Sequence, residues 1–78
     1  MNRYECEYQG KVRRYNATNA ISAMGVLCRR NKVEQYLVGC DRETRGIQYA
    51  RAWVYPTGEK SNGEWVDMRV VDEMKEVA

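Results

Sequence analysis

The chain has 78 residues, of which 44% are hydrophobic and 31% charged, and its formal net charge is +2. This composition excludes an intrinsically disordered chain, and the length leaves room for one hydrophobic core. No stretch approaches the roughly 20 apolar residues of a membrane span, and the first residues lack the layout of a secretory signal. We therefore expect one domain over residues 1–78 that resides in the cytoplasm and has no membrane partner.

A hairpin is predicted at the N-terminus. Apolar and polar residues alternate over about residues 3–8, which indicates a half-buried strand. Gly10 suits the left-handed position of a three-residue loop, which leads into a second strand. In that register Glu5 faces Arg13, whereas a two-residue loop places Cys6 opposite Arg13. Because opposite charges across a strand pair are favourable, we expect the three-residue loop.

A single helix is predicted over about residues 19–30, with Thr18 as its N-cap. Apolar residues recur on one face at helical spacing: Ala20, Ala23, Met24, Leu27 and Cys28. Gly25 lowers the helix propensity by about 1 kcal/mol relative to Ala. We interpret this glycine as a point of close packing against the sheet.

Three further strands follow the helix, over about residues 36–40, 47–55 and 65–71. Residues 72–78 are expected to form a frayed tail. The element order indicates an α+β fold, in which an antiparallel sheet of about five strands (ββαβββ order) carries one helix on one face. The other face of the sheet is then solvated or covered by a partner.

The last two strands predict which side chains occupy each face. Val66, Met68 and Val70 alternate with polar residues and Trp65, so we expect these three to face the helix. Placing the charged Arg51 or Asp67 in the core instead costs several kcal/mol unless each is paired. The outward set, with Lys60 from the following loop, forms our predicted partner-binding site: Tyr49, Arg51, Trp53, Tyr55, Lys60, Trp65, Asp67 and Arg69.

Tryptophan and tyrosine mixed with arginine are typical of an interface hot spot or of a base-stacking platform. An alternative is that these aromatic side chains close a second small core beneath residues 56–64.

A basic segment precedes these strands. Residues 9–33 contain no acidic residue and six basic ones: Lys11, Arg13, Arg14, Arg29, Arg30 and Lys32. Such a patch attracts a phosphate backbone or an acidic protein, although exposed lysine and arginine are most often only a solvated surface.

The residue types that carry catalysis and metal binding are scarce. The sequence has no histidine, no phosphate-binding loop and no nucleophile elbow, so we expect no catalytic residue, no cofactor and no enzymatic activity. Cys6, Cys28 and Cys40 are widely spaced and odd in number, which argues against a disulfide framework and against a metal site. We expect all three thiols in the core.

The run Trp53-Val54-Tyr55, the Lys/Gly-containing loop after it and the run Trp65-Val66-Asp67 resemble a family of small phage-encoded anti-CRISPR proteins that act on type I-F surveillance complexes. The resemblance implies a non-enzymatic inhibitor in the host cytosol that docks on the backbone subunits of the guide-RNA complex and obstructs target DNA. It assigns the contacts to Trp53, Lys60, Trp65 and Asp67. The first hairpin and the tail have no counterpart in that family.

The sequence thus predicts a binding protein whose partner is a protein or nucleoprotein complex of the host. Two alternatives stay open. The protein could be a small nucleic-acid-binding protein that uses the aromatic and basic residues, or a structural subunit that self-associates as a homodimer.

Overall fold

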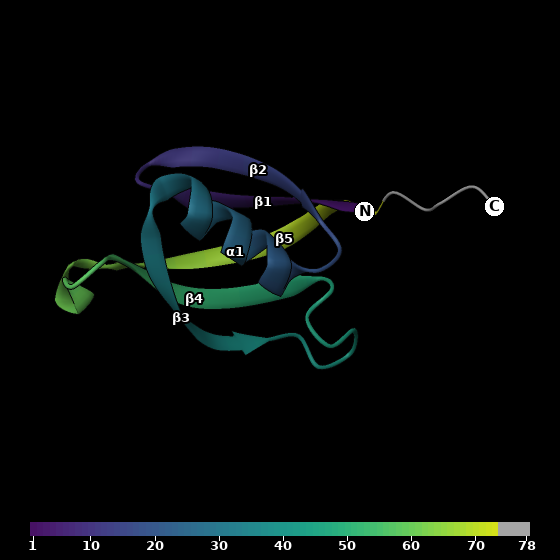
Figure 1. The fold of residues 1–78 in the computed structure, drawn as a ribbon. Helices are drawn as coiled ribbons and strands as arrows, with labels where there is room; N and C mark the ends of the chain where they lie inside the picture. Colours follow the sequence, from purple (N-terminus) through teal and green to yellow (C-terminus); the bar gives the residue numbers. More distant parts are fainter. Residues whose placement is uncertain (74–78) are drawn as a thin grey trace.

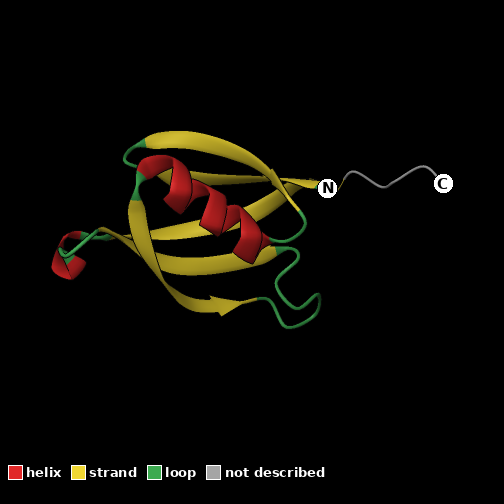
Figure 2. Ribbon diagram, in the orientation of Figure 1, coloured by secondary structure: helices red, strands yellow, loops and turns green. Residues whose placement is uncertain are grey.

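In the computed structural model, which describes residues 1–73, five strands form one antiparallel sheet and a single helix crosses one of its faces (Figures 1 and 2). The predicted α+β class and the ββαβββ order are confirmed. The elements are β1 (Asn2–Tyr8), β2 (Lys11–Ala17), α1 (Ala20–Asn31), β3 (Val33–Cys40), β4 (Tyr49–Pro56), the 3-10 turn η1 (Lys60–Asn62) and β5 (Glu64–Glu73).

The strand order across the sheet is β2-β1-β5-β4-β3, so the first and last strands of the chain pair at its centre (Figure 1). Strands β2 and β3 form the two edges. Asp72 and Glu73, which we assigned to the frayed tail, extend β5 and pair with Arg3 and Asn2. The rest of that predicted tail, 74–78, lies outside the described residues.

The predicted hairpin register is wrong. Gln9 and Gly10 both have positive φ, 53° and 72°, which is the backbone of a two-residue turn of type I′. Tyr8 therefore pairs with Lys11, and Glu5 lies opposite Arg14 instead of Arg13. Opposite charges still face each other in the observed register, because the Arg14 and Glu5 side chains form an ion pair.

Helix α1 begins one residue later than predicted. Asn19, and not Thr18, is the N-cap, and its side-chain oxygen accepts a hydrogen bond from the Ser22 N–H at 2.7 Å. The helix ends at Asn31, and its C-cap Lys32 adopts the left-handed conformation with φ 54°. None of the helices within residues 1–73 is long and apolar enough to cross a membrane.

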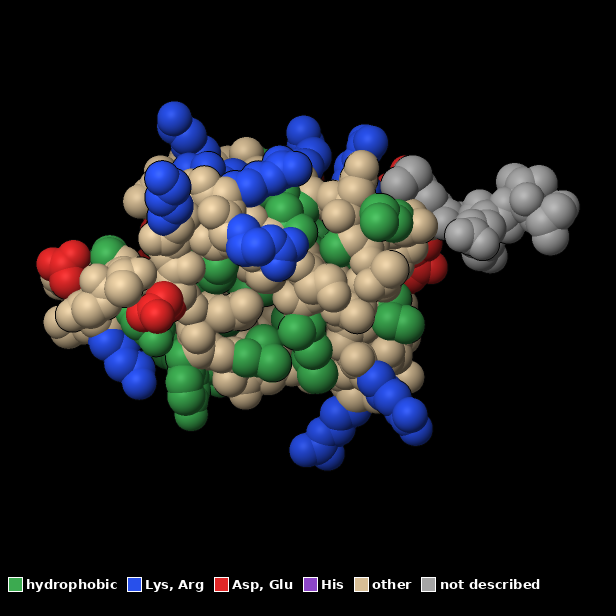
Figure 3. Space-filling view, in the orientation of Figure 1, with side chains coloured by type: hydrophobic (Ala, Val, Ile, Leu, Met, Phe, Trp, Pro, Cys, Tyr) green, Lys and Arg blue, Asp and Glu red, His purple; other side chains and the backbone are tan. Residues whose placement is uncertain are grey.

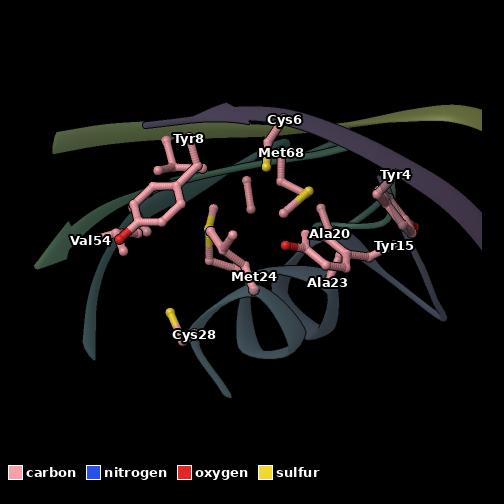
Figure 4. Close-up of a cluster of buried hydrophobic side chains, with 14 of the residues drawn as sticks. Tyr4, Cys6, Tyr8, Tyr15, Ala20, Ala23, Met24, Cys28, Val54 and Met68 are labelled. Carbon is pink, nitrogen blue, oxygen red and sulfur yellow. The ribbon is translucent and has the colours of Figure 1, made fainter. Parts of the chain in front are cut away.

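The core lies between α1 and the sheet (Figure 4). All five residues predicted on the apolar helix face are buried, as are Val66 and Met68, while Val70 is half-buried. The hydroxyl of Tyr4 is buried with its ring and donates to the backbone oxygen of Ile47 at 2.5 Å. This bond joins β1, an inner strand of the sheet, to the loop before β4.

Two details of the predicted core are wrong. Cys6 and Cys28 are buried, whereas Cys40 at the end of the edge strand β3 is exposed. Burial raises the pKa of the Cys6 thiol to about 11, so it stays protonated near neutral pH. Gly25 does not mark close packing, because a Cβ placed there meets only the Arg29 guanidinium, at 3.5 Å.

Candidate binding face

The face of the sheet that α1 does not cover, here called the open face, carries the predicted aromatic and charged residues. Small residues of β4, Ala50 and Ala52, point into the core, so the alternating side chains of that strand point outward. The register between β4 and β5 brings the outward residues together in three facing pairs: Tyr49 with Arg69, Arg51 with Asp67, and Trp53 with Trp65. Tyr55 continues the same row.

The two tryptophans lie at the end of the open face next to the loop between β4 and β5. Their ring centroids lie 5.0 Å apart with an interplanar angle of 68°, an edge-to-face contact. The guanidinium of Arg51 lies 4.6 Å from the Trp65 ring centroid, and that of Arg69 lies 4.7 Å from the Tyr49 ring. Despite these contacts Trp65 keeps 49% of its surface exposed. A large, exposed indole is thus held in one orientation by its neighbours.

The loop between β4 and β5 covers Trp53 and leaves Trp65 uncovered. The indole Nε1 of Trp53 donates to the backbone oxygen of Lys60 at 2.8 Å. Gly63 lies so close that a Cβ there would be 2.6 Å from both Trp53 Nε1 and the Val54 backbone oxygen. The predicted alternative of a second small core therefore applies to Trp53, which is half-buried beneath the loop, and not to Trp65.

A short polar network fixes the other end of the open face. The Tyr49 hydroxyl donates to Asp67 Oδ1 at 2.5 Å, and Arg51 Nε lies 3.7 Å from the same oxygen. The hydrogen bond to Asp67, followed by burial, raises the pKa of Tyr49 above its usual value. Tyr49 and Asp67 are thus already hydrogen-bonded to each other, whereas Arg51 Nε makes no hydrogen bond within residues 1–73.

The sequence prediction missed Tyr36 of β3. This residue pairs with Trp53 across β3 and β4, is 59% exposed, and lies beneath the Lys60 ammonium at 5.4 Å from its ring centroid. It extends the aromatic row to a third strand. The alternation of a single strand could not reveal this, because the assignment depends on the register between β3 and β4.

A groove of about 430 Å³ opens beside Trp65, where pairing between β1 and β5 stops after Glu5 and Arg69. Its lining is rich in carboxylates: Glu5, Glu7, Glu64 and Asp67. The backbone N–H of Gln9 donates to Glu64 Oε1 at 3.1 Å and closes one end. Arg69 also lines the groove, so four carboxylates and one guanidinium surround the space beside the exposed Trp65 ring.

The predicted basic residues do not all lie on one side. Arg14 points to the open face, where its Nε lies 3.2 Å from Glu5 Oε2. Arg13 lies on the helix side and donates to Asn31 Oδ1 at 3.2 Å, and Arg30 lies over the Tyr15 ring at 5.4 Å. Lysine and arginine side chains gather over β2 and the neighbouring surface of α1 (Figure 3). The exposed members there include Lys11, Arg29 and Lys32.

Comparison with protein-family models, with curated proteins and with solved structures finds no match.

Proposed function

We propose that the protein is a non-enzymatic binding protein that docks on a protein surface through the open face. The observation that carries the proposal is the state of Trp65, which is exposed yet held by Trp53 and Arg51. Tryptophan and arginine are the residue types that most often dominate interface energies, and a ring held in place loses little entropy on binding. Tyr36, Tyr49 and neighbouring side chains then form the surround that excludes water.

A protein surface fits the open face better than nucleic acid does. The sheet aromatics have the composition of a base-stacking platform, but the groove beside Trp65 is lined by Glu5, Glu7, Glu64 and Asp67. A phosphate backbone that approached the indole would meet these carboxylates, and like charges repel it. A protein partner with arginine or lysine beside an apolar pocket is complementary to the same surface.

We further propose, from the family resemblance, that the partner is the backbone of a type I-F CRISPR surveillance complex and that docking obstructs target DNA. The proposal assigns central contacts to Trp65 and Asp67 and supporting contacts to Lys60. Trp53 acts mainly by orienting Trp65, since the loop already covers it.

The test is binding of the purified protein to an immobilised, reconstituted type I-F complex, measured by biolayer interferometry together with capture of a target DNA. The wild type should bind and reduce DNA capture. Trp65→Ala should weaken binding at least roughly thirtyfold, because a central aromatic anchor contributes more than about 2 kcal/mol. Ile47→Ala, which removes another exposed apolar side chain from the loop before β4, is the control and should bind normally.

The outcomes separate the two parts of the proposal. No binding by the wild type refutes this partner. Binding that Trp65→Ala leaves intact refutes the open face as the docking surface.

Self-association is a second candidate function, and the edge strand β3 favours it. The run from Tyr36 to Cys40 is uncharged and exposed, and Figure 3 shows hydrophobic side chains at the surface near this strand. The other edge, β2, carries Lys11, Arg13 and Arg14, the kind of charge that protects an edge from pairing. Size-exclusion chromatography with light scattering tests the idea. A dimer that Val38→Lys converts to a monomer supports it, and a monomeric wild type contradicts it.

A further inference from the structure

The edge of β2 carries a second groove, which shares no lining residue with the groove beside Trp65. Its volume is about 330 Å³, and its lining comes from three elements: Arg3 of β1, Arg14, Tyr15 and Asn16 of β2, and Arg30 of α1. Three of these five residues are arginines, and no carboxylate from residues 1–73 lines the groove. We propose that this arginine groove binds the phosphodiester backbone of nucleic acid.

The guanidinium groups in the groove are positioned before a ligand arrives. Arg30 lies over the Tyr15 ring at 5.4 Å, a cation–π contact that holds the guanidinium beside the edge strand. Arg14 uses its Nε for the ion pair with Glu5 at 3.2 Å, and 63% of its side chain remains exposed. The terminal nitrogens of Arg14 are therefore free to donate to an anion. Bidentate donation from a fixed guanidinium matches the geometry of a phosphate group.

The remaining arginine has no competing partner within the described chain. Arg3 faces Asp72 in the register of β1 and β5, yet among residues 1–73 neither Arg3 nor Arg30 forms an ion pair. Exposed arginines of like charge repel one another in the free protein, and an anion placed between them removes that repulsion. The side-chain amide of Asn16 supplies a further donor, and none of the strands in residues 1–73 covers the outward N–H groups of the edge strand β2.

The surroundings favour a polymer of phosphates over a single small anion. Figure 3 shows lysine and arginine side chains over β2 and the neighbouring surface of α1, and the groove takes Arg14 from β2 and Arg30 from α1. The exposed Lys11, Arg29 and Lys32 extend that surface, and no acidic residue occurs in residues 9–33. One phosphate needs only the groove, whereas successive phosphates of a strand can reach the cations beyond it. The groove also joins the two sides of the sheet, because Arg14 and Arg30 meet there although they lie on opposite faces.

Fluorescence polarisation with a short labelled DNA duplex of random sequence tests the proposal. Three double variants each remove two exposed positive charges: Arg3→Gln/Arg30→Gln in the groove, Arg29→Gln/Lys32→Gln on α1 outside it, and Arg42→Gln/Arg45→Gln in the loop after β3. The wild type should bind with a salt-dependent affinity between about 50 and 200 mM salt. The groove variant should bind about tenfold more weakly. The magnitude of its slope of log affinity against log salt should be smaller by about one to two.

The α1 variant should lose less affinity for the duplex than the groove variant, and the loop variant should bind with the wild-type affinity. Equal losses in all three variants overturn the proposal, since general positive charge then explains the binding. No effect in the groove variant, or no binding by the wild type, also overturns it. Adding Arg14→Gln should weaken binding further with the melting temperature nearly unchanged, because an exposed ion pair contributes little to stability.

Vesicles that contain anionic lipid are measured in parallel, and binding to vesicles without binding to the duplex refutes nucleic acid as the ligand. The groove does not depend on the open face. A negative result here leaves the protein-docking proposal standing, because that proposal is measured on a different partner with variants at Trp65.

Discussion

Replacing Gly63 with alanine should disrupt the loop that covers Trp53. The new Cβ would lie 2.6 Å from the Val54 backbone oxygen and 2.6 Å from Trp53 Nε1, well inside van der Waals contact. The backbone oxygen belongs to a paired strand and cannot move far, so the loop or the indole must. Either movement breaks the 2.8 Å hydrogen bond from Trp53 to Lys60.

The expected loss of stability is about 1.5 to 4.5 kcal/mol. Overpacking typically costs about 1–3 kcal/mol, and the lost hydrogen bond adds about 0.5–1.5 kcal/mol. Urea denaturation monitored by tryptophan fluorescence measures the loss of stability. The same experiment detects a displaced Trp53 ring, because its exposure shifts the native emission to the red. The control is Gly39→Ala on β3, where no atom lies within 4 Å of the added Cβ and stability should stay the same or rise by up to about 1 kcal/mol. An unchanged midpoint and emission in Gly63→Ala would refute the described packing of the loop on Trp53.

Three further substitutions probe the helix, the core and the loop before β4. Gly25→Ala should raise the free energy of unfolding by about 0.5–1 kcal/mol, since the site is helical and open, and a lower melting temperature would contradict this. Met68→Asp should prevent folding by placing a charge in the core, and a cooperative thermal transition at the wild-type temperature would show that the sheet faces are misassigned. Asp41→Ala should be less stable than the wild type near neutral pH. Hydrogen bonds, chiefly from the Thr44 side chain, lower the pKa of Asp41 from 3.8 to about 2. The wild type should therefore be more stable than the variant above pH 3.8, and this difference in stability should disappear as the pH falls towards 2. If the urea midpoints of the wild type and Asp41→Ala differ by the same amount across this pH range, the ionised carboxylate is not the cause of the stability difference.

The faces of the strands and of the helix could be predicted from the sequence because burial imposes a simple rule on each. Met68 and its apolar neighbours in β5 could not exchange places with Asp67 without burying charge, and the structure follows the prediction. The same reasoning placed Trp65 on the open face. Each assignment needed only the alternation within one strand.

The predictions of the hairpin register and of the burial of Cys40 were wrong because each depends on how two strands are placed relative to one another. Opposite charges favoured Glu5 facing Arg13, but the observed register places Glu5 opposite Arg14, which is equally favourable, so charge could not discriminate. Pairing of the buried Tyr4 with Tyr15 would have decided the question. Likewise the exposure of Cys40 follows from the edge position of β3, and strand order cannot be read from any single segment.

The central pairing of β1 with β5 has a consequence for how the chain folds. The pairs β1-β2, β3-β4 and β4-β5 join segments that are neighbours in the sequence, so each can form as a local hairpin. The pairing of β1 with β5 instead closes a loop that includes almost all the described residues. The entropy of closing this loop is lost before the contacts between β1 and β5 can offset it. We therefore expect the pairing of β1 with β5 to be the rate-limiting step of folding. During synthesis β1 has one unpaired edge until β5 has been made, and a chaperone or a second nascent chain can bind that edge in the interval.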